Sequence, residues 1–129
     1  MINIAIFASG SGSNAENIIN YFASHQDIKV AIIISNNSDA YVHKRAQKLN
    51  IPSLTFKKSD FDCGTVILEK MSDYKIDFIV LAGFLLKVPN SILENFPNCI
   101  INIHPALLPK YGGKGMYGDN VHKAVKNAG

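Results

Sequence analysis

The sequence has no long hydrophobic run, no cluster of basic residues and only two cysteines. Its longest apolar stretches, 30–34 and 78–82, are far too short to span a membrane. Arginine occurs once, at Arg45, and a net charge of +3 spread along the chain does not favour a nucleic-acid surface. Cys63 and Cys99 lack the spacing of a metal site, and Cys99 is expected to be a buried, reduced thiol. We therefore expect a cytoplasmic protein without a metal site, a membrane segment or a nucleic-acid partner.

Apolar strands alternate with amphipathic helices along the 129 residues, a length that suits one domain. Strands are predicted at 3–8, 28–35, 53–56, 76–82 and 99–103. Apolar residues at helical spacing predict helices around 15–23, 42–49, 67–74, 92–96 and 121–128. Strands that are apolar on both faces favour a parallel sheet covered by helices. We predict an α/β fold with a doubly wound, mainly parallel sheet of strand order 3-2-1-4-5.

Three polar or glycine-rich stretches follow strands that this order places side by side. Residues 9–13 follow the first strand, Gly83 and Phe84 follow the fourth, and the fifth strand ends at Asn102 and His104. Parallel sheets bind ligands at the carboxyl ends of their strands, where the strand order reverses. The three stretches therefore predict one active site at this rim.

The glycine-rich turn after the first strand suits a phosphate group. Gly10 and Gly12 permit a tight backbone, and Ser13 and Asn14 open a helix whose first amide hydrogens are unpaired. The turn lacks the third glycine of a dinucleotide site and the lysine of a P-loop, and no acidic residue follows the second strand. The alternative is that Ser13 only caps the helix, and the residues alone leave both interpretations open.

Asn102 and His104 lie two positions apart on a strand, so they face the same side. A lone histidine is more often structural than catalytic, but His104 stands at the strand's carboxyl end, and Pro105 and Pro109 stiffen the loop that follows. An amide donor beside a proton-transfer group can stabilise an oxyanion. No serine or cysteine is placed as a nucleophile, which fits a substrate amine that attacks a carbonyl. The other histidines, at 25, 43 and 122, are interpreted as surface residues.

Three motifs in this order, 9–14, 81–84 and 101–109, resemble the glycinamide ribonucleotide formyltransferases. The Asn-x-His-Pro-x-Leu-Leu-Pro pattern resembles the wider formyltransferase family, and the Gly-x-Gly-Ser-Asn turn is similar to the purine enzyme alone. The resemblance covers essentially the whole chain. It implies the Rossmann-like formyltransferase fold. It also implies formyl transfer from 10-formyltetrahydrofolate to the amine of glycinamide ribonucleotide, in purine biosynthesis and one-carbon metabolism.

The resemblance also implies roles for individual residues. The substrate phosphate would be held at the first helical turn by Gly12, Ser13 and Asn14. The folate would be held by residues that follow the fourth and fifth strands, namely Leu85, Leu86, Lys87, Val88 and Asn102. Asn102 would bind near the formyl oxygen, and His104 would act as general acid and stabilise the tetrahedral intermediate. The Leu108–Pro109 bond is expected to be cis.

A catalytic aspartate of the family is implied to lie beyond Gly129, and Asp119 is expected to cap a helix instead. Residues 1–129 would then be the N-terminal portion of a single formyltransferase domain, without its C-terminal segment. We expect little or no activity from this chain alone. The expected partners are small-molecule substrates, and a homodimer is left open. Two alternatives remain: another amine substrate, such as a sugar nucleotide or tRNA, or a non-catalytic phosphate-binding module.

Overall fold

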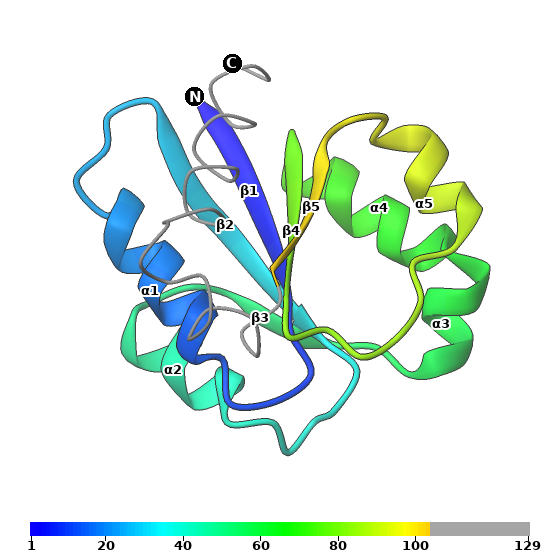
Figure 1. Cartoon of the computed structure of the whole chain (residues 1–129), viewed down its shortest axis with the longest axis horizontal. Helices are drawn as coiled ribbons and strands as arrows, with labels where there is room; N and C mark the ends of the chain where they lie inside the picture. The colour runs from blue at the N-terminus through cyan, green and yellow to red at the C-terminus, as the bar shows by residue number, and fades with distance from the viewer. Residues whose placement is uncertain (104–129) are drawn as a thin grey trace.

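A computed structural model describes residues 1–103 and shows a five-stranded parallel sheet with helices on both faces (Figure 1). The strands are β1 (Ile2–Phe7), β2 (Ile28–Ser35), β3 (Ser53–Thr55), β4 (Phe78–Ala82) and β5 (Ile100–Ile103). The helices are α1 (Ser13–Phe22), α2 (Val42–Lys48), α3 (Lys58–Cys63), α4 (Thr65–Asp73) and α5 (Asn90–Asn95). The strand order is β3-β2-β1-β4-β5, which confirms the predicted doubly wound sheet.

The sheet separates two hydrophobic cores. Alternate residues of β1 point to opposite faces, so Ile4 and Ile6 pack in the core beneath α1 and α2, while Ala5 and Phe7 pack beneath α3, α4 and α5. Helices α1 and α2 lie on one side of the sheet in Figure 1, and the other three lie on the opposite side. Because both faces of the central strands are buried, the strands read as continuous apolar runs.

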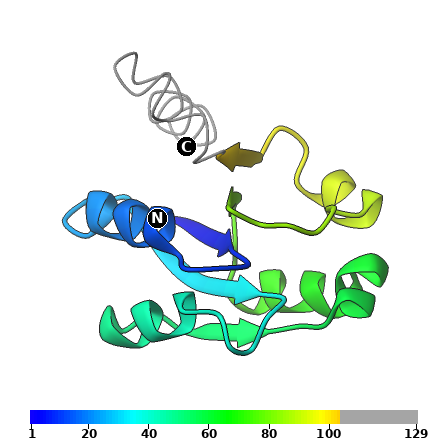
Figure 2. The same ribbon diagram turned by 60° about the horizontal axis from the view of Figure 1, so that its bottom comes forward.

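The arrows of β1, β2 and β3 point the same way in Figure 2, so their carboxyl ends lie at one end of the sheet. The pairing register shows that this rim is level. Phe7 pairs with Leu81 of β4, and Leu81 pairs with Asn102 of β5. The segments that leave β1 and β4, together with Asn102 near the end of β5, are therefore held at the same height.

The structure differs from the predicted elements at one helix. The sequence gives no apolar stripe for α3, because this six-residue helix buries a single side chain, that of Phe61. The Phe61 ring packs against Phe7 and Phe84 with ring centroids 5.9 and 5.0 Å apart. The predicted last helix at 121–128 and the Leu108–Pro109 bond lie outside the described residues.

The burial of two side chains differs from the expectation: His43 is less exposed than expected, and Cys99 is less buried. His43 is only partly exposed: its Nδ1 lies 2.9 Å from Ser53 Oγ, and its Nε2 lies 2.9 Å from Thr55 Oγ1. It joins α2 to the edge strand β3 while remaining partly exposed at the surface. Cys99 is a free thiol and half-buried rather than buried. In residues 1–103, no helix is long and apolar enough to cross a membrane.

Candidate active site

The glycine-rich turn leads from β1 into α1 through a left-handed glycine. Gly12 has φ 76° and forms the N-cap of α1, so the first helical hydrogen bond runs from the Glu16 amide to the Gly12 carbonyl at 2.9 Å. A Cβ atom at Gly12 would overlap the side chain of Val42, so the turn needs glycine there for two reasons. Ser13 is the first residue of the helix and not its cap, and no side chain caps α1. The first turn of α1 therefore keeps the unpaired amide hydrogens that suit an anion.

A small cleft lies beside this turn. Its volume is about 70 Å³, and its walls come from the turn and from the end of β4: Gly10, Ser11, Gly12, Ser13, Asn14, Ala82 and Gly83. The side-chain Nδ2 of Asn14 is buried and has no hydrogen-bond partner within the described part of the chain. A buried amide donor without a partner is costly, and Asn14 itself lines the cleft. All three residues predicted to hold phosphate thus line one cleft.

Ser9 connects the glycine-rich turn to both neighbouring strands. Its hydroxyl donates to Asn36 Oδ1 at 2.6 Å and accepts from the Leu85 amide at 2.8 Å, and its own amide donates to the Gly83 carbonyl at 3.2 Å. The Ser9 side chain is buried, with an exposure of 7%. The sequence placed Ser9 in the rim, within residues 9–13, but Asn36 was missed as a part of it. The position of Asn36 directly after β2 is a signal that could have found it.

The segment after β4 presents its residues in different directions. Gly83 turns the chain with φ 70°, and the Phe84 ring packs against Phe7 with centroids 5.4 Å apart. Of the residues predicted to line a folate site, Leu85 is 84% exposed and Lys87 is exposed. Leu86 is partly buried against the core, and Val88 is buried within it. Leu85 and Lys87 are therefore available to a ligand, whereas Val88 supports the segment from below.

Asn102 is the described member of the predicted catalytic pair. It is exposed on β5 and stands opposite Leu81, one residue before the end of the strand. Because strand residues alternate, Asn102 shares its face with Ile100, which packs in the core on the side of the 84–88 segment. The Asn102 amide is thus on the same side of the sheet as that segment. His104 lies outside the described residues.

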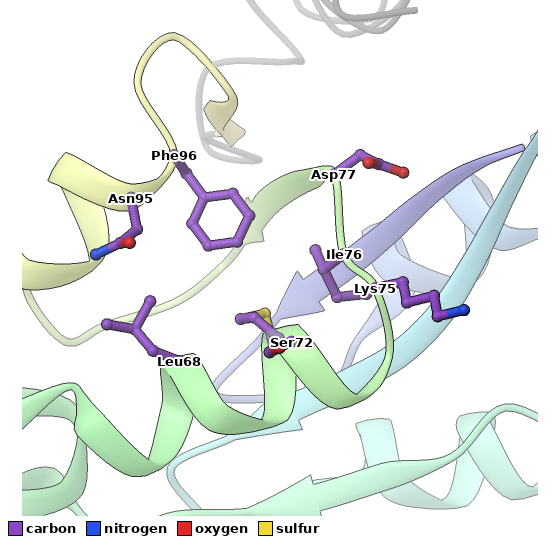
Figure 3. Close-up of a pocket in the computed structure, with 8 residues that line it drawn as sticks. Leu68, Ser72, Lys75, Ile76, Asp77, Asn95 and Phe96 are labelled. Carbon is purple, nitrogen blue, oxygen red and sulfur yellow. The ribbon is translucent and has the colours of Figure 1, made fainter.

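Larger hollows lie away from this rim. One of about 380 Å³ is lined by α4 and the end of α5, and Figure 3 shows the Phe96 ring pointing toward α4. Another, of about 580 Å³, lies where β2 begins and has His25 and Lys29 among its walls. In residues 1–103, no three His, Cys, Asp or Glu side chains are grouped to hold a metal ion. Within residues 1–103, the rim alone combines a glycine-rich turn, a nearby buried donor without a partner and the ends of three adjacent strands.

Comparison with known proteins shows which family the chain resembles. A family model described as "Formyl transferase" matches residues 2–129. Among curated proteins, the chain is 38% identical to the chloroplastic phosphoribosylglycinamide formyltransferase of Arabidopsis thaliana, over 98% of this chain and 45% of the relative. It is also 38% identical to the phosphoribosylglycinamide formyltransferase of Haemophilus influenzae, over 95% of this chain and 63% of the relative. The chain therefore spans about half the length of these relatives.

Solved structures show the same likeness. Glycinamide ribonucleotide transformylase 1 from Geobacillus kaustophilus superposes with a TM-score of 0.74 and 32% identity, covering 95% of this chain and 68% of that one. The enzyme of the same name from Symbiobacterium toebii superposes with a TM-score of 0.74 and 33% identity, covering 81% of this chain and 52% of that one.

Proposed function

The chain belongs to the formyl transferase family, and from that premise we propose that it binds glycinamide ribonucleotide and takes part in its formylation by 10-formyltetrahydrofolate. Residues 1–129 would be part of a single catalytic domain that works in the cytoplasm on small-molecule substrates. The relatives named phosphoribosylglycinamide formyltransferase support this choice of acceptor. No observation favours a sugar nucleotide or a tRNA as the acceptor.

One observation carries the proposal: Gly12, Ser13 and Asn14 line one cleft at the start of α1, and the buried Asn14 side-chain amide has no partner within residues 1–103. The cleft of about 70 Å³ has room for a group the size of a phosphate but not for a whole nucleotide. The helix dipole and the amides of the first turn favour negative charge there. Gly12, Ser13 and Asn14 would hold the phosphate, and the remainder of the substrate would extend along the rim toward Asn102.

The proposed reaction is direct transfer without an acyl-enzyme. The substrate amine attacks the formyl carbon, the bond from that carbon to the folate nitrogen breaks, and one proton passes from the attacking nitrogen to the folate nitrogen. Asn102 would donate a hydrogen bond to the formyl oxygen as it gains charge, and His104 would transfer the proton. Positioning of the two substrates would supply much of the rate, and proton transfer about 10²–10⁴-fold.

The folate would lie against the segment after β4, with Leu85, Leu86, Lys87, Val88 and Asn102 around it. Exposed Leu85 offers an apolar surface to a flat ring, and exposed Lys87 offers a cation to a carboxylate tail. Buried Val88 would act by holding this segment in place.

The proposal is tested by calorimetric titration of the 129-residue chain with glycinamide ribonucleotide. Asn14→Ala should weaken binding about tenfold, because a charge-assisted hydrogen bond is lost. Asn20→Ala is the matched control, since Asn20 is an exposed asparagine in the last turn of the same helix. Equal affinity of the two variants, or no binding by the unaltered chain, would contradict the proposal.

A further inference from the structure

Arg45, the single arginine of the chain, reaches from α2 to the glycine-rich turn. Its Nε donates to the Ser11 carbonyl at 2.7 Å, and its Nη1 lies 3.1 Å from Glu16 Oε2. Ser11 precedes α1 and Glu16 lies in the helix's first turn, so one guanidinium joins the glycine-rich turn to the helix that follows it. The side chains of Arg45 and Glu16 are 25% and 27% exposed, so water screens their ion pair only in part.

Helix α2 also fixes where this guanidinium sits. The Val42 amide donates to the Gly10 carbonyl at 3.2 Å, and the Val42 side chain occupies the space that a Cβ of Gly12 would need. The Arg45 guanidinium carbon lies 4.9 Å from the centre of the Tyr41 ring, a cation–π distance. Arg45 is therefore placed by packing as well as by its hydrogen bonds.

The bond to the Ser11 carbonyl has a consequence for the next amide. A trans peptide unit is planar, and its C=O and N–H point in opposite directions. When Arg45 holds the Ser11 carbonyl, the N–H of Gly12 must point away from Arg45. The bond from Val42 to the Gly10 carbonyl sets the direction of the Ser11 N–H in the same way. Two successive amides of the cleft wall are thus oriented from α2.

We propose that Arg45 is a positioning residue for phosphate binding, which orients the amides of the glycine-rich turn without touching the phosphate itself. This inference rests on the proposed function. The positive charge of Arg45 is already matched by the Glu16 carboxylate, and its Nε already donates to the Ser11 carbonyl. Arg45 therefore contributes through the geometry of the turn and not through attraction of the anion.

Three variants of the 129-residue chain test this role. Arg45→Gln removes the guanidinium, and Arg45→Lys keeps the charge but not the fork that bonds Ser11 and Glu16 together. Lys44→Gln is the matched control, because it removes one positive charge from the neighbouring position of α2, where the ammonium lies 5.8 Å from the Tyr41 ring centre. Two quantities are measured for each variant: the dissociation constant of glycinamide ribonucleotide, and amide hydrogen exchange of residues 10–16 without ligand. Far-UV circular dichroism checks that each variant is folded.

Arg45→Gln should weaken ligand binding about tenfold, the size expected for one lost charge-assisted hydrogen bond, and should speed exchange in the turn. Arg45→Lys should stay impaired, and Lys44→Gln should bind within about twofold of the unaltered chain, because a removed surface charge away from the contact has little effect. Full binding by Arg45→Lys, or equal losses in Arg45→Gln and Lys44→Gln, would show that charge alone matters and would overturn the positioning role. Unchanged exchange in Arg45→Gln would overturn it as well. Failure of the unaltered chain to bind would instead overturn the proposed function, and with it any role of Arg45 in phosphate binding.

Discussion

The backbone amide of Leu85 donates a 2.8 Å hydrogen bond to the hydroxyl oxygen of Ser9, 76 positions earlier in the chain. The same hydroxyl donates to Asn36 Oδ1 at 2.6 Å, so one small side chain ties together the segments that leave β1, β2 and β4. These are the segments that form the rim of the candidate site. The spacing between the glycine-rich turn and the segment after β4 is therefore set by a buried polar contact as well as by the sheet.

Replacement of Ser9 by alanine should destabilise the fold. The change leaves the Leu85 amide and the Asn36 side-chain oxygen without their partner, at a cost of about 1–3 kcal/mol in the free energy of unfolding. Urea denaturation followed by circular dichroism measures this quantity. Ser11→Ala serves as the control, because the Ser11 side chain is exposed. Equal urea midpoints for the two variants would show that water replaces the Ser9 contacts without loss.

The two glycines of the turn should respond differently to alanine. Gly12→Ala places a side chain at φ 76° and against Val42, and these two effects together should cost at least about 2 kcal/mol of unfolding free energy. Gly10→Ala meets no atom within 4 Å and should be tolerated. Thermal unfolding of both variants checks this, together with titration by glycinamide ribonucleotide. A Gly12→Ala variant as stable as Gly10→Ala would mean that the turn relaxes away from α2.

The thiol of Cys63 should react faster than that of an ordinary cysteine at neutral pH. The Cys63 thiol is exposed, and its Sγ lies 3.4 Å from Thr65 Oγ1. Hydrogen bonds from the Thr65 hydroxyl and the Thr65 backbone lower the pKa of this thiol. The thiolate is the reactive form, so a lowered pKa shifts the midpoint of alkylation toward lower pH. Iodoacetamide labelling across pH, read by peptide mass, gives this midpoint for Cys63.

Thr65→Val should move that midpoint to higher pH, because it removes the hydroxyl while keeping the residue's shape. Ser59→Ala, an exposed hydroxyl on α3, is the control and should leave the midpoint where it is. A midpoint that is the same in Thr65→Val and in the unaltered chain would show that the Thr65 hydroxyl has no part in the reactivity of Cys63.

The strand order could be predicted from the sequence because five parallel strands that are covered by helices on both faces can be connected in only a few ways. Runs such as 30–34 and 78–82 are apolar on both faces, and that pattern suits strands covered by helices on both sides. Right-handed crossovers then allow few arrangements of five such strands. The glycine-rich turn was visible for a similar reason, since two glycines at the end of a buried strand mark a local change of backbone direction. Helix α3 was not visible, because a single buried residue, Phe61, gives no periodic pattern.

The contacts that hold the rim could not be predicted in this way. Arg45 bonds to a carbonyl 34 positions away, and Ser9 bonds to groups 27 and 76 positions away. Which polar side chain meets which backbone group depends on how helices and loops pack, and the periodicity of a sequence contains no record of it. His43 shows the same limit, since the sequence predicted a surface residue but not that its two ring nitrogens join α2 to β3.

The sequence by itself therefore determined the order of the strands, the place of the rim and the first turn of α1, because hydrophobic alternation and glycine act locally or through general rules of chain crossing. Only the tertiary structure decided that Gly12 is held against Val42, that Arg45 bonds to the Ser11 carbonyl and that the Asn14 amide is buried without a partner among residues 1–103. Those features depend on close packing between segments distant in the chain, where shifts of less than an ångström decide whether a hydrogen bond forms.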